Sequence, residues 1–315
     1  MAVSEAQNSW LIADIGATSS RCGIYSRVNK TTRDVQVFRN DNYAGLETLL
    51  DAYLASVDIH PVSAALAVAA AVDSDAIRMV NRDWAFSGAA IRARCALEQV
   101  RIINDFHAVA YALPSLGDED RVEIGHARAY RGGSIAVLGP GSGLGMSAWI
   151  ETDTNSAAMF GEGGHITVSG RNSAEDKIVD AFRERFGHCS AERVLSGPGL
   201  ITLHSVMHGI DVAGSEEITK NSDDRHCAAT LNQFFQFLGS AAADRALITG
   251  AYGGVYIAGG TVPACVSEIR VSGFRTRFDA KNRYTDYMQA IPTWVITASQ
   301  PGLIGMAAYV DKFAN

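Results

Sequence analysis

The sequence predicts an α/β protein with two domains, and three observations lead to this fold class. The chain has 315 residues, which is long for one hydrophobic core, and 47% of them are apolar while 19% are charged. Segments with strand-like spacing alternate with segments of helical spacing. Two glycine-rich turns, residues 14–18 (DIGAT) and residues 139–145 (GPGSGLG), each lie between two strand-like segments, which is a weak internal repeat.

The first domain is expected to open with a β-hairpin around the first turn. Residues 11–13 precede this turn, and residues 21–25 follow it with partly alternating apolar spacing. Apolar residues then keep helical spacing from residue 46 to residue 54, and residues 64–70 have the composition of a buried strand.

The first domain is expected to end near residue 115. A strand-like segment at residues 100–103 leads into Asn104 and Asp105, which open a short helix. Helical and strand signals then weaken between Gly117 and Gly133, which favours a domain boundary just before this stretch.

The second domain repeats the alternation. Residues 135–138 and 146–150 are strand-like on the two sides of the second turn. Ser173, with Asp176 three residues later, predicts a capping box at the start of a helix that Gly187 ends.

A later amphipathic helix leads into an apolar strand bracketed by paired glycines. The helical positions are Leu231, Phe234, Phe235 and Leu238, and the strand lies within residues 253–260. The paired glycines allow the backbone to lie against a flat ligand such as adenine, and close packing of a helix on a strand explains them equally well.

The two glycine turns point to nucleotide triphosphate chemistry. Glycine lets backbone N–H groups approach a ligand closely where a Cβ would clash. Two such turns could therefore bind the two ends of a polyphosphate. The spacing of the second turn does not fit the dinucleotide pattern G-x-G-x-x-G, and the P-loop pattern G-x-x-x-x-G-K-[ST] does not occur. Either turn alone could be an ordinary hairpin turn.

Composition and charge exclude several other classes. The net charge of −7, with no block of lysine or arginine, argues against nucleic acid and anionic membrane surfaces as partners. The longest apolar run, residues 64–72, is far shorter than the about 20 residues that span a bilayer. The first residues lack the pattern of a secretory signal, so a cytoplasmic protein is expected. Five separated cysteines are expected to be buried reduced thiols, and no zinc-binding spacing occurs.

Three sites in the sequence could supply catalytic or ligand-binding groups, and each has a simpler explanation. Asp105 could be a catalytic carboxylate or a helix cap. Glu162 and His165, within residues 161–165 (GEGGH), are presented by a glycine-rich loop, although a single histidine is more often structural and a single glutamate more often a solvated charge. Glu192 could be explained by its place in the first turn of a helix.

The order and identity of these motifs resemble those of the bacterial ATP-dependent glucokinases, which belong to the actin-like sugar kinase superfamily. The resemblance covers nearly the whole chain. The motifs that carry it are residues 14–18 (DIGAT), 84–87 (WAFS), 103–106 (INDF), 139–145, 161–165, 192–200 (ERVLSGPGL), 253–260 and 301–303 (PGL).

The resemblance implies a two-domain actin-like (ribonuclease H-like) fold with the active site in a cleft between the domains. The expected domains are residues 1–115 with 303–315, and residues 116–302. It also implies transfer of the γ-phosphoryl group of ATP to the 6-hydroxyl of D-glucose, with ATP and Mg²⁺ as cofactors, and a homodimer.

Residue roles follow from the resemblance alone. Asp105 would be the general base, and Asn104, Glu162, His165 and Glu192, together with Asp105, would bind the sugar. The remaining residues would bind the nucleotide and its metal. Asp14 would orient hydrated Mg²⁺, and the transferring phosphate would be faced by Gly16, Ala17 and Thr18. The other phosphates would be bound by Gly139, Gly141, Ser142 and Gly143, and adenosine would lie by Gly259 and Gly260.

The chain departs from the family pattern in a few places. Ala17 and Ser19 replace a glycine and an asparagine of the first turn, and Ala71 and Ser74 replace a proline and a glycine. The cysteine-rich zinc motif of the related repressor and kinase group is missing, which indicates the zinc-free branch.

Alternative functions on the same fold are a kinase for another hexose or amino sugar, a non-catalytic sugar sensor and a general actin-like ATPase. The sensor class carries an N-terminal DNA-binding helix pair, whereas the first strand here is expected to begin near Trp10. A general ATPase would not need the sugar-binding cluster.

Overall fold

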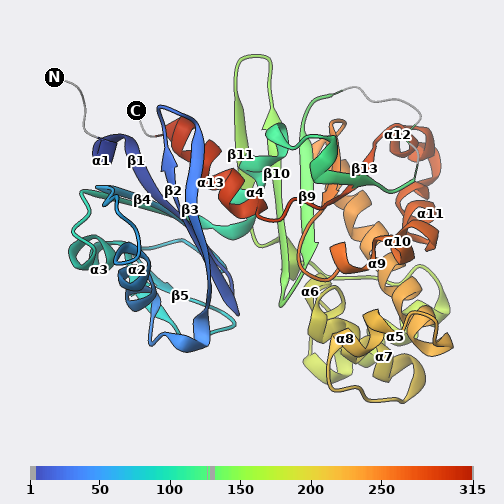
Figure 1. Ribbon diagram of the computed structural model, residues 1–315. Coiled ribbons are helices and arrows are strands. Elements are labelled where there is room, and N and C mark those ends of the chain that lie inside the picture. Colours follow the sequence, from blue (N-terminus) through green and yellow to red (C-terminus); the bar gives the residue numbers. More distant parts are fainter. Residues whose placement is uncertain (1–4, 126, 128–131, 314–315) are drawn as a thin grey trace. The chain divides into compact units, whose positions relative to one another are not determined.

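The structure is a computed structural model that describes residues 5–125, 127 and 132–313 (Figure 1). The chain divides into two compact units, residues 1–115 with 299–315 and residues 116–298. The first unit takes in the chain again at Ser299, ahead of the expected residue 303, because the whole of α13 (Pro301–Phe313) packs in it against α4 (Asp105–Ala112). That these units are the functional domains stays a prediction.

A five-stranded sheet forms the centre of the first unit, in the order β3-β2-β1-β4-β7. β1, β2 and β3 are antiparallel neighbours, whereas β4 and β7 run parallel to β1. The strands are β1 (Ser9–Ile15), β2 (Ser19–Ser26), β3 (Thr31–Arg39), β4 (Ser63–Val68) and β7 (Gln99–Asn104), with a separate ribbon of β5 (Ala76–Arg78) and β6 (Ala85–Ser87). The expected hairpin at the first turn is confirmed.

Helices cover both faces of this sheet (Figure 1). Leu11, Ala13 and Ile15 of β1 join the core cluster that includes Leu49 of α2 and Ile91 of α3. On the other face, α13 contacts β1 and β4, and α4 contacts β4 and β7. The helices outside α4 and α13 are α1 (Glu5–Asn8), α2 (Leu46–Leu54) and α3 (Gly88–Arg94), and the single turns of 3-10 helix are η1 (Asn40–Asn42) and η2 (Leu113–Ser115).

A six-stranded sheet forms the centre of the second unit, in the order β11-β10-β9-β12-β13-β8. Two antiparallel pairings, β11 with β10 and β10 with β9, are followed by two parallel ones, as in the first unit. The strands are β8 (Arg121–Glu123), β9 (Ile135–Pro140), β10 (Leu144–Glu151), β11 (Ser156–Phe160), β12 (Gly254–Ile257) and β13 (Thr293–Ile296). The weak internal repeat of the sequence is therefore a repeat of sheet topology.

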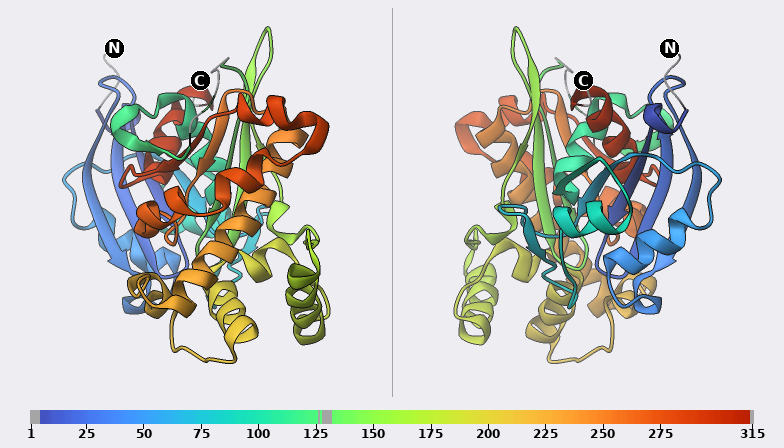
Figure 2. Two further views of the ribbon diagram at one scale, coloured as in Figure 1. Left: turned by 90° about the vertical axis from the view of Figure 1, so that its right-hand side faces the viewer. Right: turned by 90° about the vertical axis from the view of Figure 1, so that its left-hand side faces the viewer.

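Helix α9 (Arg225–Thr249) packs on β9 and β12 and carries much of the core of this unit (Figure 2). The other helices are α5 (Ser173–Phe186), α6 (Ala191–Val194), α7 (Gly197–His208), α8 (Ser215–Lys220), α10 (Val266–Val271), α11 (Phe274–Asp279) and α12 (Thr285–Gln289). The turns of 3-10 helix are η3 (Asp118–Asp120), η4 (Gly163–His165), η5 (Pro263–Cys265) and η6 (Asn282–Tyr284).

The predicted capping box of α5 is wrong by one residue. The N-cap is Asn172, whose side-chain oxygen accepts hydrogen bonds from the N–H groups of Ala174 and Glu175, both at 3.0 Å. Ser173 is the first helical residue, so its hydroxyl cannot serve as the N-cap. The end of the helix is as predicted, because Gly187 has φ 76° and follows Phe186.

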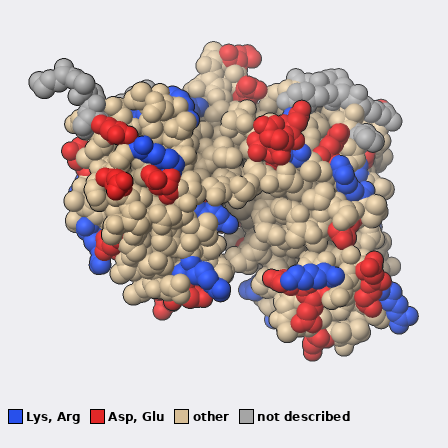
Figure 3. Space-filling model, in the orientation of Figure 1, with Lys and Arg blue, Asp and Glu red and all other residues tan. Residues whose placement is uncertain are grey.

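Charged side chains of both signs lie on the surface, and the cysteines are unpaired thiols. On the face that Figure 3 shows, acidic and basic side chains are intermixed in small groups. In the described part of the chain, no helix is both long and apolar enough to cross a bilayer. All five cysteines are free; four are buried, whereas Cys95 is half-buried.

Candidate functional site

The first glycine turn connects β1 to β2. Gly16 donates its N–H to the carbonyl oxygen of Ser19 at 3.1 Å, which closes the hairpin. Ala17 is not among the four non-glycine residues with positive φ in the described part of the chain. Its methyl group is therefore accommodated without backbone strain, and this departure from the family pattern does not distort the turn.

Asp14 lies at the end of β1, beside the start of α13. Its Oδ2 is 3.8 Å from a guanidinium nitrogen of Arg21, and a Cβ added to Gly302 would come within 2.6 Å of its carboxylate. Burial raises the pKa of Asp14, and the charge of Arg21 opposes that shift. A nearby cation would favour the ionised form, so this carboxylate suits the neighbourhood of a metal ion.

Asn104 and Asp105 lie where β7 passes into α4. The helix cap is Asn104, whose Oδ1 accepts the N–H groups of Phe106 at 2.9 Å and of His107 at 3.2 Å. Asp105 is the first helical residue, and its Oδ1 also accepts from the N–H of Phe106 at 2.9 Å. The alternative that Asp105 caps this helix is therefore wrong.

The carboxyl ends of the parallel strands bring these residues to one edge of the sheet. Ile15 of β1 is level with Val68 of β4, and Val68 is level with Asn104 of β7. Two strand spacings, about 10 Å, therefore separate β1, which carries Asp14, from β7, which leads into Asp105. Ligands of open α/β sheets bind at such an edge.

The second glycine turn connects β9 to β10 and is shorter than the motif suggests. Gly139 and Gly145 lie within the strands and face each other in register, so the turn itself is residues 141–143. Gly141 donates to the carbonyl of Gly143 at 2.8 Å, and its own carbonyl accepts from the N–H of Gly197 at 2.8 Å.

Gly259 and Gly260 lie beside this turn. Gly259 has φ 86°, and a Cβ there would come within 2.2 Å of the carbonyl oxygen of Pro140. Thr261 donates its N–H to the same oxygen at 3.3 Å. Close packing therefore explains Gly259, but its neighbour is the end of strand β9 and not a helix as the alternative supposed; a Cβ on Gly260 would meet nothing within 4 Å.

Glu162 and His165 project from a glycine loop that lies on β10. A Cβ on Gly163 would come within 2.9 Å of the sulfur of Met146, and one on Gly164 within 2.3 Å of the carbonyl oxygen of Leu144. The side chains of Glu162 and His165 are 63% and 59% exposed, with Oε2 and Nε2 3.9 Å apart. His165 is therefore not a buried structural histidine.

Glu192 reaches the first residue of β10. It lies in the first turn of α6, as expected, and its Oε2 accepts the N–H of Leu144 at 2.9 Å. Because the loop with Glu162 and His165 lies on the same end of β10, the structure brings the three side chains to one region, next to the second turn.

The predicted residues thus form two groups, one on each unit. The first-unit group is Asp14, Gly16, Ala17, Thr18, Asn104 and Asp105. The second-unit group is Gly139, Gly141, Ser142, Gly143, Glu162, His165, Glu192, Gly259 and Gly260. Asn40, Arg82 and Gly302 contact the first-unit group from distant parts of the chain. None of them was expected in the site, although Gly302 lies in the motif at residues 301–303.

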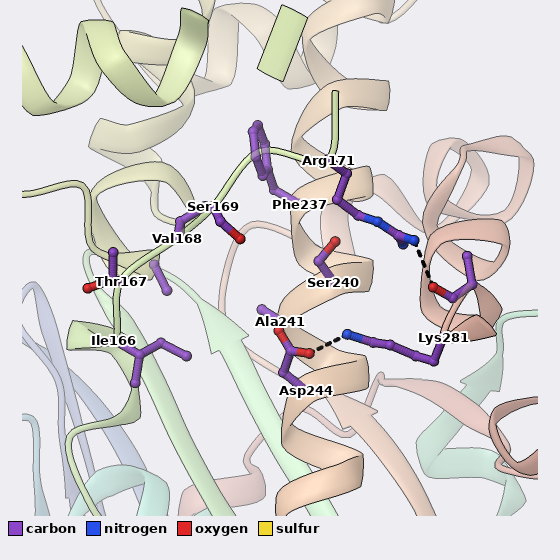
Figure 4. A pocket seen from close by; sticks show the side chains of 12 residues that line it. Ile166, Thr167, Val168, Ser169, Arg171, Phe237, Ser240, Ala241, Asp244 and Lys281 are labelled. Carbon is purple, nitrogen blue, oxygen red and sulfur yellow. Dashed lines mark hydrogen bonds and ion pairs between the residues drawn. The ribbon is translucent and has the colours of Figure 1, made fainter. Parts of the chain in front are cut away.

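A cavity of about 300 Å³ lies behind the loop that carries Glu162 and His165 (Figure 4). Ile166 and Ala191, which follow His165 and precede Glu192, are among its lining residues. Arg171 donates to the carbonyl of Ala280 across it, and Lys281 pairs with Asp244. The cavity contains none of the predicted site residues.

Comparison with known proteins gives one consistent result. The sequence model of the family described as Glucokinase matches residues 11–313. A protein of Paramagnetospirillum magneticum named glucokinase is 39% identical over 316 residues, covering 97% of this chain and 98% of its own. The crystal structure of a glucokinase from an Antarctic psychrotroph is 33% identical, has a TM-score of 0.83 and covers 97% of this chain and 99% of its own.

A more distant solved structure shares the fold. It is a ROK family glucokinase from Streptomyces griseus in complex with glucose and AMPPNP, 18% identical, with a TM-score of 0.62. It covers 96% of this chain and 98% of its own. The expected fold, an α/β sugar kinase fold of the actin-like type, is confirmed.

Proposed function

The chain belongs to the glucokinase family, and on that premise we propose that it transfers the γ-phosphoryl group of ATP to the 6-hydroxyl of D-glucose. The products are glucose 6-phosphate and ADP. The observation that carries the proposal is the exposed pair Glu162 and His165 beside Glu192, next to a glycine turn. Carboxylates and an imidazole are suited to a ligand with many hydroxyl groups, and a glycine turn is suited to phosphates.

Asp105 is the proposed general base. Its carboxylate accepts the proton of the 6-hydroxyl as that oxygen attacks the γ-phosphorus and the bond from phosphorus to the ADP oxygen breaks. Phosphoryl transfer depends mainly on alignment and on neutralising charge, so one correctly placed carboxylate is sufficient for the proton. Asn104 remains a proposed sugar ligand, and its side chain is held in place because its Oδ1 caps α4 and its Nδ2 donates to the carbonyl of Ala70 at 3.2 Å.

Asp14 is the proposed outer ligand of hydrated Mg²⁺. A magnesium ion bound to the phosphates would neutralise their charge, and the partly buried carboxylate of Asp14 has the chemistry to hold its water shell. Gly16, Ala17 and Thr18 are assigned to the transferring phosphate. The turn at residues 141–143, with Gly139 before it, is assigned to the other phosphates, and Gly259 and Gly260 are assigned to adenosine.

The test is ATP-dependent turnover with glucose, mannose, fructose, glucosamine and N-acetylmannosamine, each with Mg²⁺. Glucose is expected to give the highest kcat/KM. A higher value for another sugar would make the protein a kinase for that sugar, and binding of sugar without turnover would make it a sensor.

The base assignment is tested by Asp105→Asn. The amide keeps the shape of the side chain but cannot accept the proton, so kcat is expected to fall roughly 10²–10⁴-fold. Glucose affinity and melting temperature should change little, because Asn104 remains the cap. In the matched variant Asn104→Ala stability should fall by about 1 kcal/mol because the cap is lost, and glucose affinity should fall as well because Asn104 is a proposed sugar ligand. Near-normal turnover of Asp105→Asn would transfer the base role to Glu162.

Two further expectations belong to this proposal. The family resemblance implies a homodimer, which sedimentation equilibrium of the purified chain measures directly. All five cysteines are free, as in proteins of a reducing compartment, which supports function in the cytoplasm.

A further inference from the structure

The carbonyl groups of the first glycine turn are held from one side. The side-chain nitrogen of Asn40 donates to the carbonyl oxygen of Gly16 at 2.8 Å and to that of Ala17 at 3.3 Å. The backbone N–H of Asn40 donates to the carbonyl oxygen of Thr18 at 3.0 Å. One residue, which follows β3 directly, thus binds three successive carbonyls of the turn.

The orientation of the Asn40 amide is itself fixed. The residue is fully buried, and its Oδ1 accepts the hydroxyl of Ser20 at 2.7 Å. Because the oxygen is used by this donor, the nitrogen must face the turn. A buried amide with satisfied partners holds its geometry more firmly than a solvated one, since breaking these bonds would leave polar groups unpaired.

Arg82 adds a charged donor to the same turn. One guanidinium nitrogen donates to the carbonyl oxygen of Ala17 at 3.2 Å, and both terminal nitrogens contact one carboxylate oxygen of Asp41 at 2.9 Å. The guanidinium also lies 4.6 Å from the centre of the Trp84 ring. Its side chain is 16% exposed, so three contacts fix a largely buried cation beneath the turn.

The direction of these carbonyls determines where the N–H groups point. No cis peptide occurs in the described part of the chain, and in a trans peptide the C=O and N–H bonds point in opposite directions. Since the carbonyls of Gly16 and Ala17 face Asn40 and Arg82, the N–H groups of Ala17 and Thr18 face the opposite side. Adjacent N–H groups aimed the same way form an anion-binding concavity.

We propose that Asn40 and Arg82 are positioning residues that hold the first turn with its N–H groups directed at the terminal phosphate of the nucleotide. The inference rests on the proposed function for the identity of the anion. Both side chains lie outside every motif named in the sequence, and the turn that they orient, residues 16–18, has a single glycine, Gly16, as its first residue.

The test compares two matched arginine variants of the full-length protein. For each variant, calorimetry measures the binding of AMPPNP in the presence of Mg²⁺, and steady-state kinetics give KM and kcat. Arg82→Gln removes the charged donor, so AMPPNP affinity is expected to fall, and KM for Mg·ATP to rise, about tenfold. Glucose affinity should remain unchanged. Arg78→Gln removes an arginine that is 74% exposed and pairs with Asp83, and it should leave all these values unchanged.

Asn40→Asp tests the role of the Asn40 amide by the same measurement of AMPPNP affinity. It keeps the volume and the acceptor for Ser20 but replaces the nitrogen that faces the turn by an oxygen, so AMPPNP affinity should fall at least as far as in Arg82→Gln. If this buried substitution prevents folding, Arg82→Gln decides alone, and Arg82→Lys should restore part of the loss.

The inference is overturned if Arg82→Gln keeps the wild-type AMPPNP affinity and the wild-type KM for Mg·ATP. It is also overturned if Arg82→Gln lowers the melting temperature but leaves nucleotide binding unchanged. A separate measurement, sugar phosphorylation by the unaltered protein, tests the proposed function. If the unaltered protein binds AMPPNP but does not phosphorylate any sugar, the proposed function fails, whereas loss of AMPPNP binding in the two variants would still support the positioning role.

Discussion

The two glycine turns occupy equivalent places in the two sheets, yet they are held by different means. The first turn is held by side chains, the amide of Asn40 and the guanidinium of Arg82. The second is held by backbone, with carbonyls that accept from the N–H groups of Gly197 and Thr261 and with Gly259 against Pro140. The same local shape thus depends on side-chain donors at the first turn, and on backbone donors and the absence of a Cβ at Gly259 at the second.

This difference predicts where each turn is sensitive. The first turn should tolerate changes of its own residues and respond to the loss of a distant donor. The second should respond to any side chain added at its contact glycines. Three substitutions test this contrast. They are given in order of decreasing effect on the free energy of unfolding or of AMPPNP binding.

Gly259→Ala should destabilise the protein by about 3 kcal/mol. The methyl group would come within 2.2 Å of the Pro140 carbonyl, and φ 86° is unfavourable for any residue with a Cβ, so overpacking and backbone strain add. Urea unfolding measures the change. Gly260→Ala is the matched control, because a Cβ there meets nothing within 4 Å. Equal stability of the two variants would show that the second turn is not held by close backbone packing.

Glu192→Gln should weaken AMPPNP binding by about 1 kcal/mol, roughly fivefold. The carboxylate accepts the N–H of Leu144 at the end of the second turn, and an amide oxygen accepts more weakly than a charged one. Glucose binding should weaken as well, because Glu192 is a proposed sugar ligand. Calorimetry with each ligand separates the effects. The comparison variant is Glu162→Gln, which should affect glucose alone; a loss of glucose affinity alone in Glu192→Gln as well would contradict the link to the turn.

Ala17→Gly should have the smallest effect, a destabilisation of about 0.5 kcal/mol from greater freedom of the unfolded chain. Because Ala17 does not have positive φ and its carbonyl is already held, the glycine of the family pattern offers no relief of strain. AMPPNP affinity should stay within twofold of the wild-type value. A tenfold change in either direction would show that the residues of the first turn, and not their distant donors, set its geometry.

The sequence predicted the parts of the fold that depend on local patterns. The hairpins around both turns followed from apolar strands on either side, and the end of α5 followed from Gly187. Strand β3 was not expected, because none of its residues is buried and its pattern does not alternate clearly between apolar and polar residues. Strand β8 was not expected, because three residues carry too little periodicity to be recognised.

The residues of the candidate site also fall into those that local sequence patterns identify and those that only the fold brings together. Motif residues such as Asp14, Asp105 and Glu192 could be named from the sequence, since their neighbours in the chain identify them. Asn40 and Arg82 could not be named, because only the pairing of β2 with β3 and the ribbon of β5 and β6 bring them to the first turn. Asn172 was missed for a simpler reason: two residues able to cap a helix are adjacent there, and periodicity does not locate a helix start to within one residue.

The return of the chain to the first unit has a consequence for biosynthesis. Helix α13 packs on α4 and β1, and a Cβ on Gly305 would overlap the carbonyl of Ala108, so the two helices meet backbone to backbone. During synthesis, residues 1–115 therefore leave the ribosome well before the segment that completes their unit, because the chain returns to that unit only at Ser299, 184 residues later. At about 5–20 residues per second this takes roughly 10–40 s. The second unit, which is continuous in sequence, is available to fold during that interval, so the part of the protein translated first is expected to be completed last.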